Sequence, residues 1–424
     1  MVIVTQKVNR FRDHFLRDFD GIINYYGYPA ETHTITTIDG YILTMHRIPV
    51  PGGIPVYLQH GFMDSSATWV LTGPLNGLGF ILANRGYDVW MGNFRGNKYS
   101  RNHISRRTDD VEFWDFCWDD MGKKDMPAMI DHILGVTGWP RVFHVGHSMG
   151  TTAFYVMASC VPEYNSKIFA HFSLAPVAFM KHCKSPIRHL TYWEAILQRE
   201  TGTPENGARP TDLIENLERK FIDHEGKEDV LPDVQALKTI GKIALRGIQH
   251  GELTVEIDEP LKKLCIANVT NENICKNFMF IIFGYDEAQM NEELLPVYLG
   301  HCPAGSSVKT MNHYAQEIDS GQFRQFDYHD PKQNLRHYNS VTPPKYDLSK
   351  ITAPISLHYS ANDALAAIVD VEKFAGKVSS IVNMHLIDDP HFNHIDFTWG
   401  IDAPSLVYEN VLQIMGNITF FPVY

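Results

Sequence analysis

The stretch Arg141–Tyr155, RVFHVGHSMGTTAFY, decides the fold. An apolar run leads into a Gly-His-Ser-Met-Gly core, and small and apolar residues follow it. The run predicts a buried strand and the residues after it predict a helix, so Ser148 stands at a strand-to-helix turn. Gly146 and Gly150 let strand and helix approach without side-chain clash. The Ser148 hydroxyl then lies at a helix N-terminus, which favours developing negative charge and makes it a candidate nucleophile.

Strand-like and helix-length segments alternate on both sides of that turn. A β-branched hairpin at 32–50 has an Asp-Gly turn at residues 39 and 40. Short apolar strands are predicted at 54–61, 86–93, 141–148, 167–179, 353–363 and 380–389. This alternation predicts an α/β fold whose mostly parallel sheet is covered by helices on both faces, with the hairpin adding antiparallel strands at one edge.

Residues 181–308 interrupt this pattern. They are polar and charged, helical in period where they are periodic, and then carry the apolar block NFMFIIFGY at 277–285. We therefore predict a core formed by 1–180 and 309–424, with a helical insertion at 181–308.

Composition narrows the possible partners. The 424 residues are 44% hydrophobic and 20% charged, so the chain can bury a large core. The formal net charge of −12 argues against nucleic acid and anionic membranes as electrostatic partners. No apolar run reaches the length of a transmembrane helix, and no signal peptide is visible at the N-terminus.

The six cysteines show no zinc-site spacing. Cys265 and Cys275 bracket a short polar segment that a disulfide could close, although reduced thiols fit the cysteine pattern equally well. Glycosylation sequons begin at Asn268 and Asn417 and favour the secretory pathway.

A serine nucleophile needs an acid and a base, which follow it in the chain in that order in this type of fold. The loop at the end of HYSAND carries Asp363, which we favour as the acid. Its rival Asp370 is expected on the following helix, facing solvent. His385 lies within the last strand and is expected to be structural. His391 and His394 both lie in the loop after that strand, and spacing does not separate them as candidates for the base.

The oxyanion hole is expected from backbone amides. LQHGFMDSS places His60 and Gly61 at the end of the first core strand, so the amide of Phe62 can face Ser148. The second donor is the amide of Met149, directly after the candidate nucleophile.

The sequence resembles the acid lipase family of α/β hydrolases, which includes gastric lipase and lysosomal acid lipase. The resemblance covers nearly the whole chain from about Tyr26. It rests on YPAETHTITTIDGYILTMHRIP, LQHGFMDSSATWV, GYDVWMGNFRGNKYSRNH, GHSMGTT, PPKYDLSKITAPI, SANDALA and FNHIDFTWG.

The resemblance implies an α/β-hydrolase core with a helical cap and lid at 181–308. It selects His394 of the NHxDF stretch as the base, and it agrees with Asp363 as the acid. The amides of Phe62 and Met149 correspond to the family's oxyanion hole. A disulfide in the family's cap corresponds to a pair between cysteines 265 and 275.

Three features depart from the family. Met149 replaces the glutamine of the mammalian members, which is harmless for a backbone donor. HGF replaces the commoner HGL. The signal peptide expected of a secreted or lysosomal protein, the localisation that the resemblance implies, is missing.

The function expected from the resemblance is hydrolysis of neutral lipid esters, triacylglycerol or sterol esters, at a lipid–water interface. The reaction proceeds through an acyl-enzyme and needs no metal or organic cofactor. Two alternatives are a carboxylesterase for short soluble esters and a non-catalytic lipid carrier on a lipase scaffold. The presence of Ser148, Asp363 and His394 speaks against the carrier. The sequence leaves the oligomeric state open.

Overall fold

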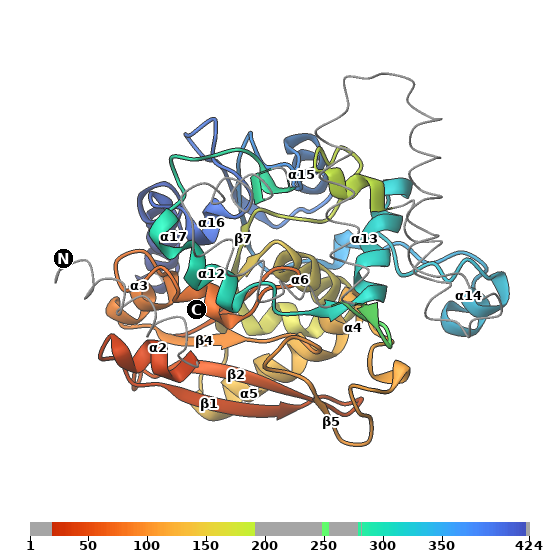
Figure 1. Ribbon diagram of the computed structural model, residues 1–424, viewed down its shortest axis with the longest axis horizontal. Helices are drawn as coiled ribbons and strands as arrows, with labels where there is room; N and C mark the ends of the chain where they lie inside the picture. The colour runs from red at the N-terminus through yellow and green to blue at the C-terminus, as the bar shows by residue number, and fades with distance from the viewer. Residues whose placement is uncertain (1–18, 191–247, 254–278, 281, 421–424) are drawn as a thin grey trace.

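A central sheet organises the molecule (Figure 1). The computed structural model describes residues 19–190, 248–253, 279–280 and 282–420. Within these ranges nine strands form the main sheet. In spatial order they are β1 (Glu31–Thr36), β2 (Tyr41–Ile48), β4 (Asp88–Gly92), β3 (Pro55–Gln59), β6 (Val142–His147), β7 (Ile168–Leu174), β11 (Ile355–Tyr359) and β12 (Ile381–Leu386), with β5 (Asn102–His103) beside β2.

The sheet is parallel from β4 through β12 and antiparallel at β1, β2 and β5. The predicted α/β fold is confirmed, including the hairpin at one edge. That hairpin turns at Asp39 and Gly40, where a φ of 94° requires the glycine. Strands β3, β4 and β6 are buried along their whole length, as continuous apolar runs predict for a sheet covered on both faces.

Helices cover both faces of the sheet. Their bounds are α2 (Phe19–Tyr25), α3 (Leu78–Asn84), α4 (Trp118–Asp120), α5 (Met126–Thr137), α6 (Met149–Cys160), α12 (Leu295–His301), α13 (Val308–Ser320), α14 (Pro331–Tyr338), α15 (Ile368–Ala375), α16 (Asp396–Trp399) and α17 (Glu409–Phe420). Apolar residues of α5, α6 and α15 form one core cluster, and those of α2, α3 and α17 form a second. Strand β3 joins both, because Tyr57 lies in the first cluster and Val56 and Leu58 in the second.

A buried arginine links the hairpin to this core. Arg95 Nε donates to Asp125 Oδ1 at 2.8 Å, and its Nη1 donates to Asp39 Oδ2 at 2.8 Å. The guanidinium carbon lies 4.0 Å from the centre of the Tyr41 ring. Because Asp39 belongs to the hairpin turn and Asp125 directly precedes α5, this one side chain ties the edge of the sheet to a covering helix.

The insertion at 181–308 lies largely outside the described residues, and its bounds remain a prediction. Its described part contains α12 and the three strands of a small antiparallel sheet, which are β8 (Ile248–Gln249), β9 (Glu252–Leu253) and β10 (Ser306–Ser307). This sheet was not predicted, because strands of two residues have no periodic pattern to read. None of the described helices is long and apolar enough to cross a lipid bilayer.

Cys265, Cys275 and Asn268 also lie outside the described residues, so the disulfide and the first glycosylation site remain predictions. Asn417 is exposed on α17. Its glycosylation remains a prediction as well.

Candidate active site

The strand-to-helix turn at Ser148 has the strained geometry that its sequence predicts. Ser148 follows β6, precedes α6 and has a φ of 52°, which a residue with a side chain rarely adopts. A Cβ on Gly150 would stand 2.4 Å from the carbonyl oxygen of Gln59, and one on Gly146 would stand 2.8 Å from the carbonyl carbon of Gly150. Both glycines are therefore required by close backbone approach.

Ser148, His394 and Asp363 form a continuous hydrogen-bonded series. The His394 Nε2 atom lies 2.8 Å from Ser148 Oγ, and its Nδ1 atom lies 2.9 and 2.8 Å from the two carboxylate oxygens of Asp363. Asp363 follows β11, and His394 lies between β12 and α16. The structure thus brings together three sequence-predicted residues from three separate loops at the carboxyl end of the sheet.

Asp363 is held as a carboxylate. Burial by itself raises the pKa of Asp363, but the adjacent His394 ring and hydrogen bonds from the amides of Ala366 and Leu365 outweigh burial and hold the pKa below its usual value. Both amides donate to Asp363 Oδ1 at 2.8 Å. A buried carboxylate in this position fixes the histidine ring, so that its Nε2 atom points at the serine.

The loop after β3 lies directly against the serine. A Cβ on Gly61 would stand 3.1 Å from the Cβ of Ser148, so a side chain here would force this loop and the serine slightly apart. Phe62 follows Gly61, and Met149 is the first residue of α6. Within the described part of the chain, neither amide donates a hydrogen bond to a backbone carbonyl. Both predicted oxyanion donors thus belong to segments that adjoin Ser148.

Comparisons with known proteins identify the family to which the chain belongs. Residues 19–73 match the family described as partial alpha/beta-hydrolase lipase region, and residues 54–211 match the alpha/beta hydrolase fold. Lipase 1 of Drosophila melanogaster is 36% identical over 403 residues, which cover 94% of this chain and 80% of that protein. Gastric triacylglycerol lipase of Rattus norvegicus is 36% identical, covering 93% and 91%. Human lysosomal acid lipase/cholesteryl ester hydrolase is 35% identical, covering 93% and 89%. The chain belongs to the acid lipase family.

In this acid lipase, the residue before the serine supports the histidine. His147 Nε2 lies 2.9 Å from the carbonyl oxygen of His394, so Nε2 carries the proton and donates. Burial lowers the pKa of His147 to about 3, and the neighbouring His394 adds to this effect. The ring is therefore neutral. Sequence reasoning did not assign a role to His147, although its place in the Gly-His-Ser motif was a signal that could have found it.

A second histidine fixes the loop that carries Phe62. His60 Nδ1 donates to the carbonyl oxygen of Gly61 at 2.7 Å, and its Nε2 accepts from the amide of Phe94 at 3.2 Å. Asn97 Nδ2 also lies 3.2 Å from Nε2 and donates to the carbonyl oxygen of Asp64 at 3.3 Å. Sequence reasoning missed this network. Its signal was the cluster of polar residues directly after β4, the strand beside β3.

One site prediction is wrong. Asp370 lies on α15 as predicted, but its carboxylate is buried rather than exposed to solvent. Its Oδ2 accepts from the amide of His182 at 2.8 Å, and its Oδ1 lies 3.0 Å from the His182 ring. The partner is 188 positions away in the sequence, so local periodicity gave no sign of it.

The three remaining histidine predictions are resolved by position. His385 lies within β12, and its Nε2 donates to the carbonyl oxygen of Leu406 at 2.9 Å, a structural contact. His391 is exposed, whereas His394 is buried between the serine and the aspartate. The geometry therefore separates two histidines that spacing alone left equivalent.

The apolar block of the insertion reaches the active site. Phe283 stacks parallel to the His394 ring with 6.0 Å between ring centres, and its carbonyl oxygen accepts from the His394 amide at 3.3 Å. Met279 and Phe280 are buried. This end of the insertion therefore contacts the catalytic histidine candidate directly.

Among the described residues, no three histidine, cysteine, aspartate or glutamate side chains gather into a group that could hold a metal ion.

Proposed function

We propose that this acid lipase hydrolyses neutral lipid esters with Ser148 as nucleophile, His394 as base and then acid, and Asp363 as the residue that orients the histidine. The observation that carries the proposal is the 2.8 Å approach of His394 Nε2 to the oxygen of a strained serine. This distance is within range for direct proton transfer.

In the first step Ser148 Oγ attacks the ester carbonyl carbon and passes its proton to His394 Nε2. The carbonyl oxygen becomes an oxyanion that accepts hydrogen bonds from the amides of Phe62 and Met149. The tetrahedral intermediate collapses, and the leaving alcohol takes the proton from His394. Water then attacks the carbonyl carbon of the acyl-enzyme and passes a proton to His394. The second tetrahedral intermediate collapses, Ser148 Oγ takes this proton from His394, and the fatty acid is released.

The substrate class follows from the relatives and from the insertion. Two relatives are named as a triacylglycerol lipase and a cholesteryl ester hydrolase. The Phe283 ring beside His394 supplies an apolar wall at the reacting centre, as an acyl chain needs. Triacylglycerol and sterol esters presented at a lipid–water interface are the substrates we propose, and a secreted or lysosomal protein is the localisation consistent with these relatives.

The test compares wild type with Ser148→Ala on emulsified triolein, on cholesteryl oleate and on soluble p-nitrophenyl butyrate. Ser159→Ala is the matched control, because among the described residues this buried serine hydrogen-bonds only to Val156 and Cys160 of its own helix, α6. We expect Ser148→Ala alone to abolish turnover and to abolish labelling by a serine-reactive phosphonate. Turnover of the soluble ester without turnover of the emulsions would favour the carboxylesterase. Absence of labelling in the wild type would favour the lipid carrier.

A further inference from the structure

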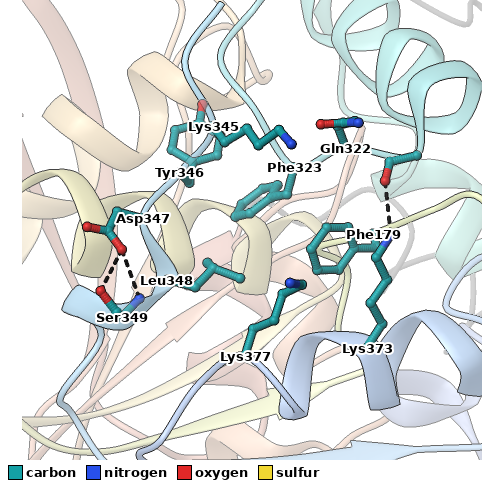
Figure 2. A pocket seen from close by; sticks show the side chains of 11 residues that line it. Phe179, Gln322, Phe323, Lys345, Tyr346, Asp347, Leu348, Ser349, Lys373 and Lys377 are labelled. Atoms are coloured by element: carbon teal, nitrogen blue, oxygen red, sulfur yellow. Dashed lines mark hydrogen bonds between the residues drawn. The ribbon is translucent and has the colours of Figure 1, made fainter.

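A cavity lies outside the candidate active site (Figure 2). It has a volume of about 430 Å³, within the range of small-molecule sites. The segment after β7, the loop after α13, the segment before β11 and the end of α15 form its walls. None of Ser148, Asp363, His394, Phe62 and Met149 lines it.

The floor of this cavity is apolar and fixed by packing. Phe179, Phe323, Tyr346 and Leu348 are all buried. The Phe323 ring lies 4.5 Å from the Tyr346 ring and 6.2 Å from the Phe179 ring, measured between centres. Such a surface suits an alkyl chain.

The rim is cationic. Lys345, Lys373 and Lys377 line the opening and are exposed. Lys373 Nζ donates to the carbonyl oxygen of Gly321 at 3.0 Å. In the part of the chain that the structure describes, the ammonium groups of Lys345 and Lys377 form no ion pair. Figure 2 shows both side chains extending toward the aromatic floor from opposite sides.

The single acidic residue of the lining does not neutralise this rim. Asp347 Oδ1 accepts from the amide and the hydroxyl of Ser349, at 3.2 and 2.6 Å. The lining therefore contains three lysines and one aspartate, a local excess of positive charge, although the formal net charge of the whole chain is −12. A local excess of positive charge over an apolar floor selects a ligand with an anionic head and an alkyl tail.

We propose that this cavity binds the anion of a fatty acid, with the carboxylate between Lys345 and Lys377 and the alkyl chain on the aromatic floor. This is a ligand site separate from the reacting centre. It gives the enzyme a place to hold the class of product that the proposed function releases, but binding there does not depend on catalysis.

The test is calorimetric titration of the full chain with dodecanoate as a dissolved monomer, after a long-alkyl phosphonate has blocked Ser148. Lys345→Gln and Lys377→Gln are each expected to weaken binding about threefold, and the double variant about tenfold. Lys332→Gln, an exposed lysine on α14, is the matched control and should bind as wild type. Dodecanol, which lacks the charge, should bind equally to all four variants and the wild type.

Chain length tests the floor. Decanoate should bind about tenfold more weakly than dodecanoate, because each buried methylene contributes to affinity. Equal dodecanoate affinities in wild type and the double variant would overturn the proposal. So would binding only to vesicles of anionic phospholipid, which would make this face a membrane surface. If Ser148 resists the phosphonate, the proposed function fails, yet the lysine dependence of binding can still be measured.

Discussion

Acidification should lower the unfolding free energy of this protein because it contains buried histidines. The contribution of one of them, His358, can be measured separately with a substitution. His358 lies on β11 with its ring completely buried, and its Nε2 atom lies 2.9 Å from Ser356 Oγ. Burial, aided by the nearby His385, lowers the pKa of His358 to about 3. In the unfolded chain the pKa of a histidine is about 6.5.

Because the pKa is lower in the folded state, the unfolded chain binds the proton first. The contribution of His358 to stability is therefore fully present above pH 6.5 and is lost as the pH falls toward 3. The slope is about 1.4 kcal/mol per pH unit, which gives a loss of about 2 kcal/mol between pH 7 and pH 5. We expect His358→Asn to reduce the pH-dependent loss of unfolding free energy over this interval by about that amount.

The assay is urea unfolding of wild type and His358→Asn at pH 7, 6 and 5, comparing the pH dependence rather than the absolute stability. His391→Asn is the control, since this side chain is exposed. Burial raises the pKa of Asp64 to about 7 and that of Asp396 to about 8, so these groups stabilise the fold on acidification. They are present in both proteins and cancel in the difference. An equal loss in wild type and His358→Asn would refute the reasoning.

Three further outcomes are expected at the site and in the core. Gly61→Ala places a Cβ 3.1 Å from the Cβ of Ser148, so the loop of Phe62 must shift, and kcat on soluble esters should fall about a hundredfold with unfolding free energy nearly unchanged. Asp363→Asn should lower kcat by on the order of 10⁴-fold while phosphonate labelling persists slowly, because the orienting charge beside His394 is lost. Arg95→Met leaves the buried Asp125 carboxylate without its cation and should reduce the urea-derived unfolding free energy by about 3–5 kcal/mol, and an unchanged midpoint would contradict the role assigned to this ion pair.

The sequence predicts the sheet well because its signals are local. Buried parallel strands appear in the sequence as short apolar runs. The turn at Ser148 is recognisable from its two glycines, which the close approach of neighbouring backbone requires. The place of Asp363 beside His394 was predictable because this fold carries an acidic residue in a loop after a late strand. Each of these inferences depends on a few neighbouring residues.

The remaining parts of the site depend on contacts between distant segments. His391 and His394 are three positions apart in one loop, yet only one ring reaches both Asp363 and Ser148. Spacing could not tell which, and the family resemblance made the choice. The burial of Asp370 against His182 is the same kind of fact, because a helix period locates a residue on a face without saying what covers that face.

His147 shows how the three loops of the site depend on one another. Its neutral ring donates its one N–H to the carbonyl oxygen of His394, so the loop of His394 is anchored to the residue before Ser148. The opposite ring atom, Nδ1, stands only 3.1 Å from where a Cβ on Gly61 would lie. The buried His147 side chain therefore lies against the loop of Gly61 and Phe62, the turn at Ser148 and the loop of His394. A side chain at Gly61 would therefore press on His147 and on Ser148 together, which is why glycine suits this position.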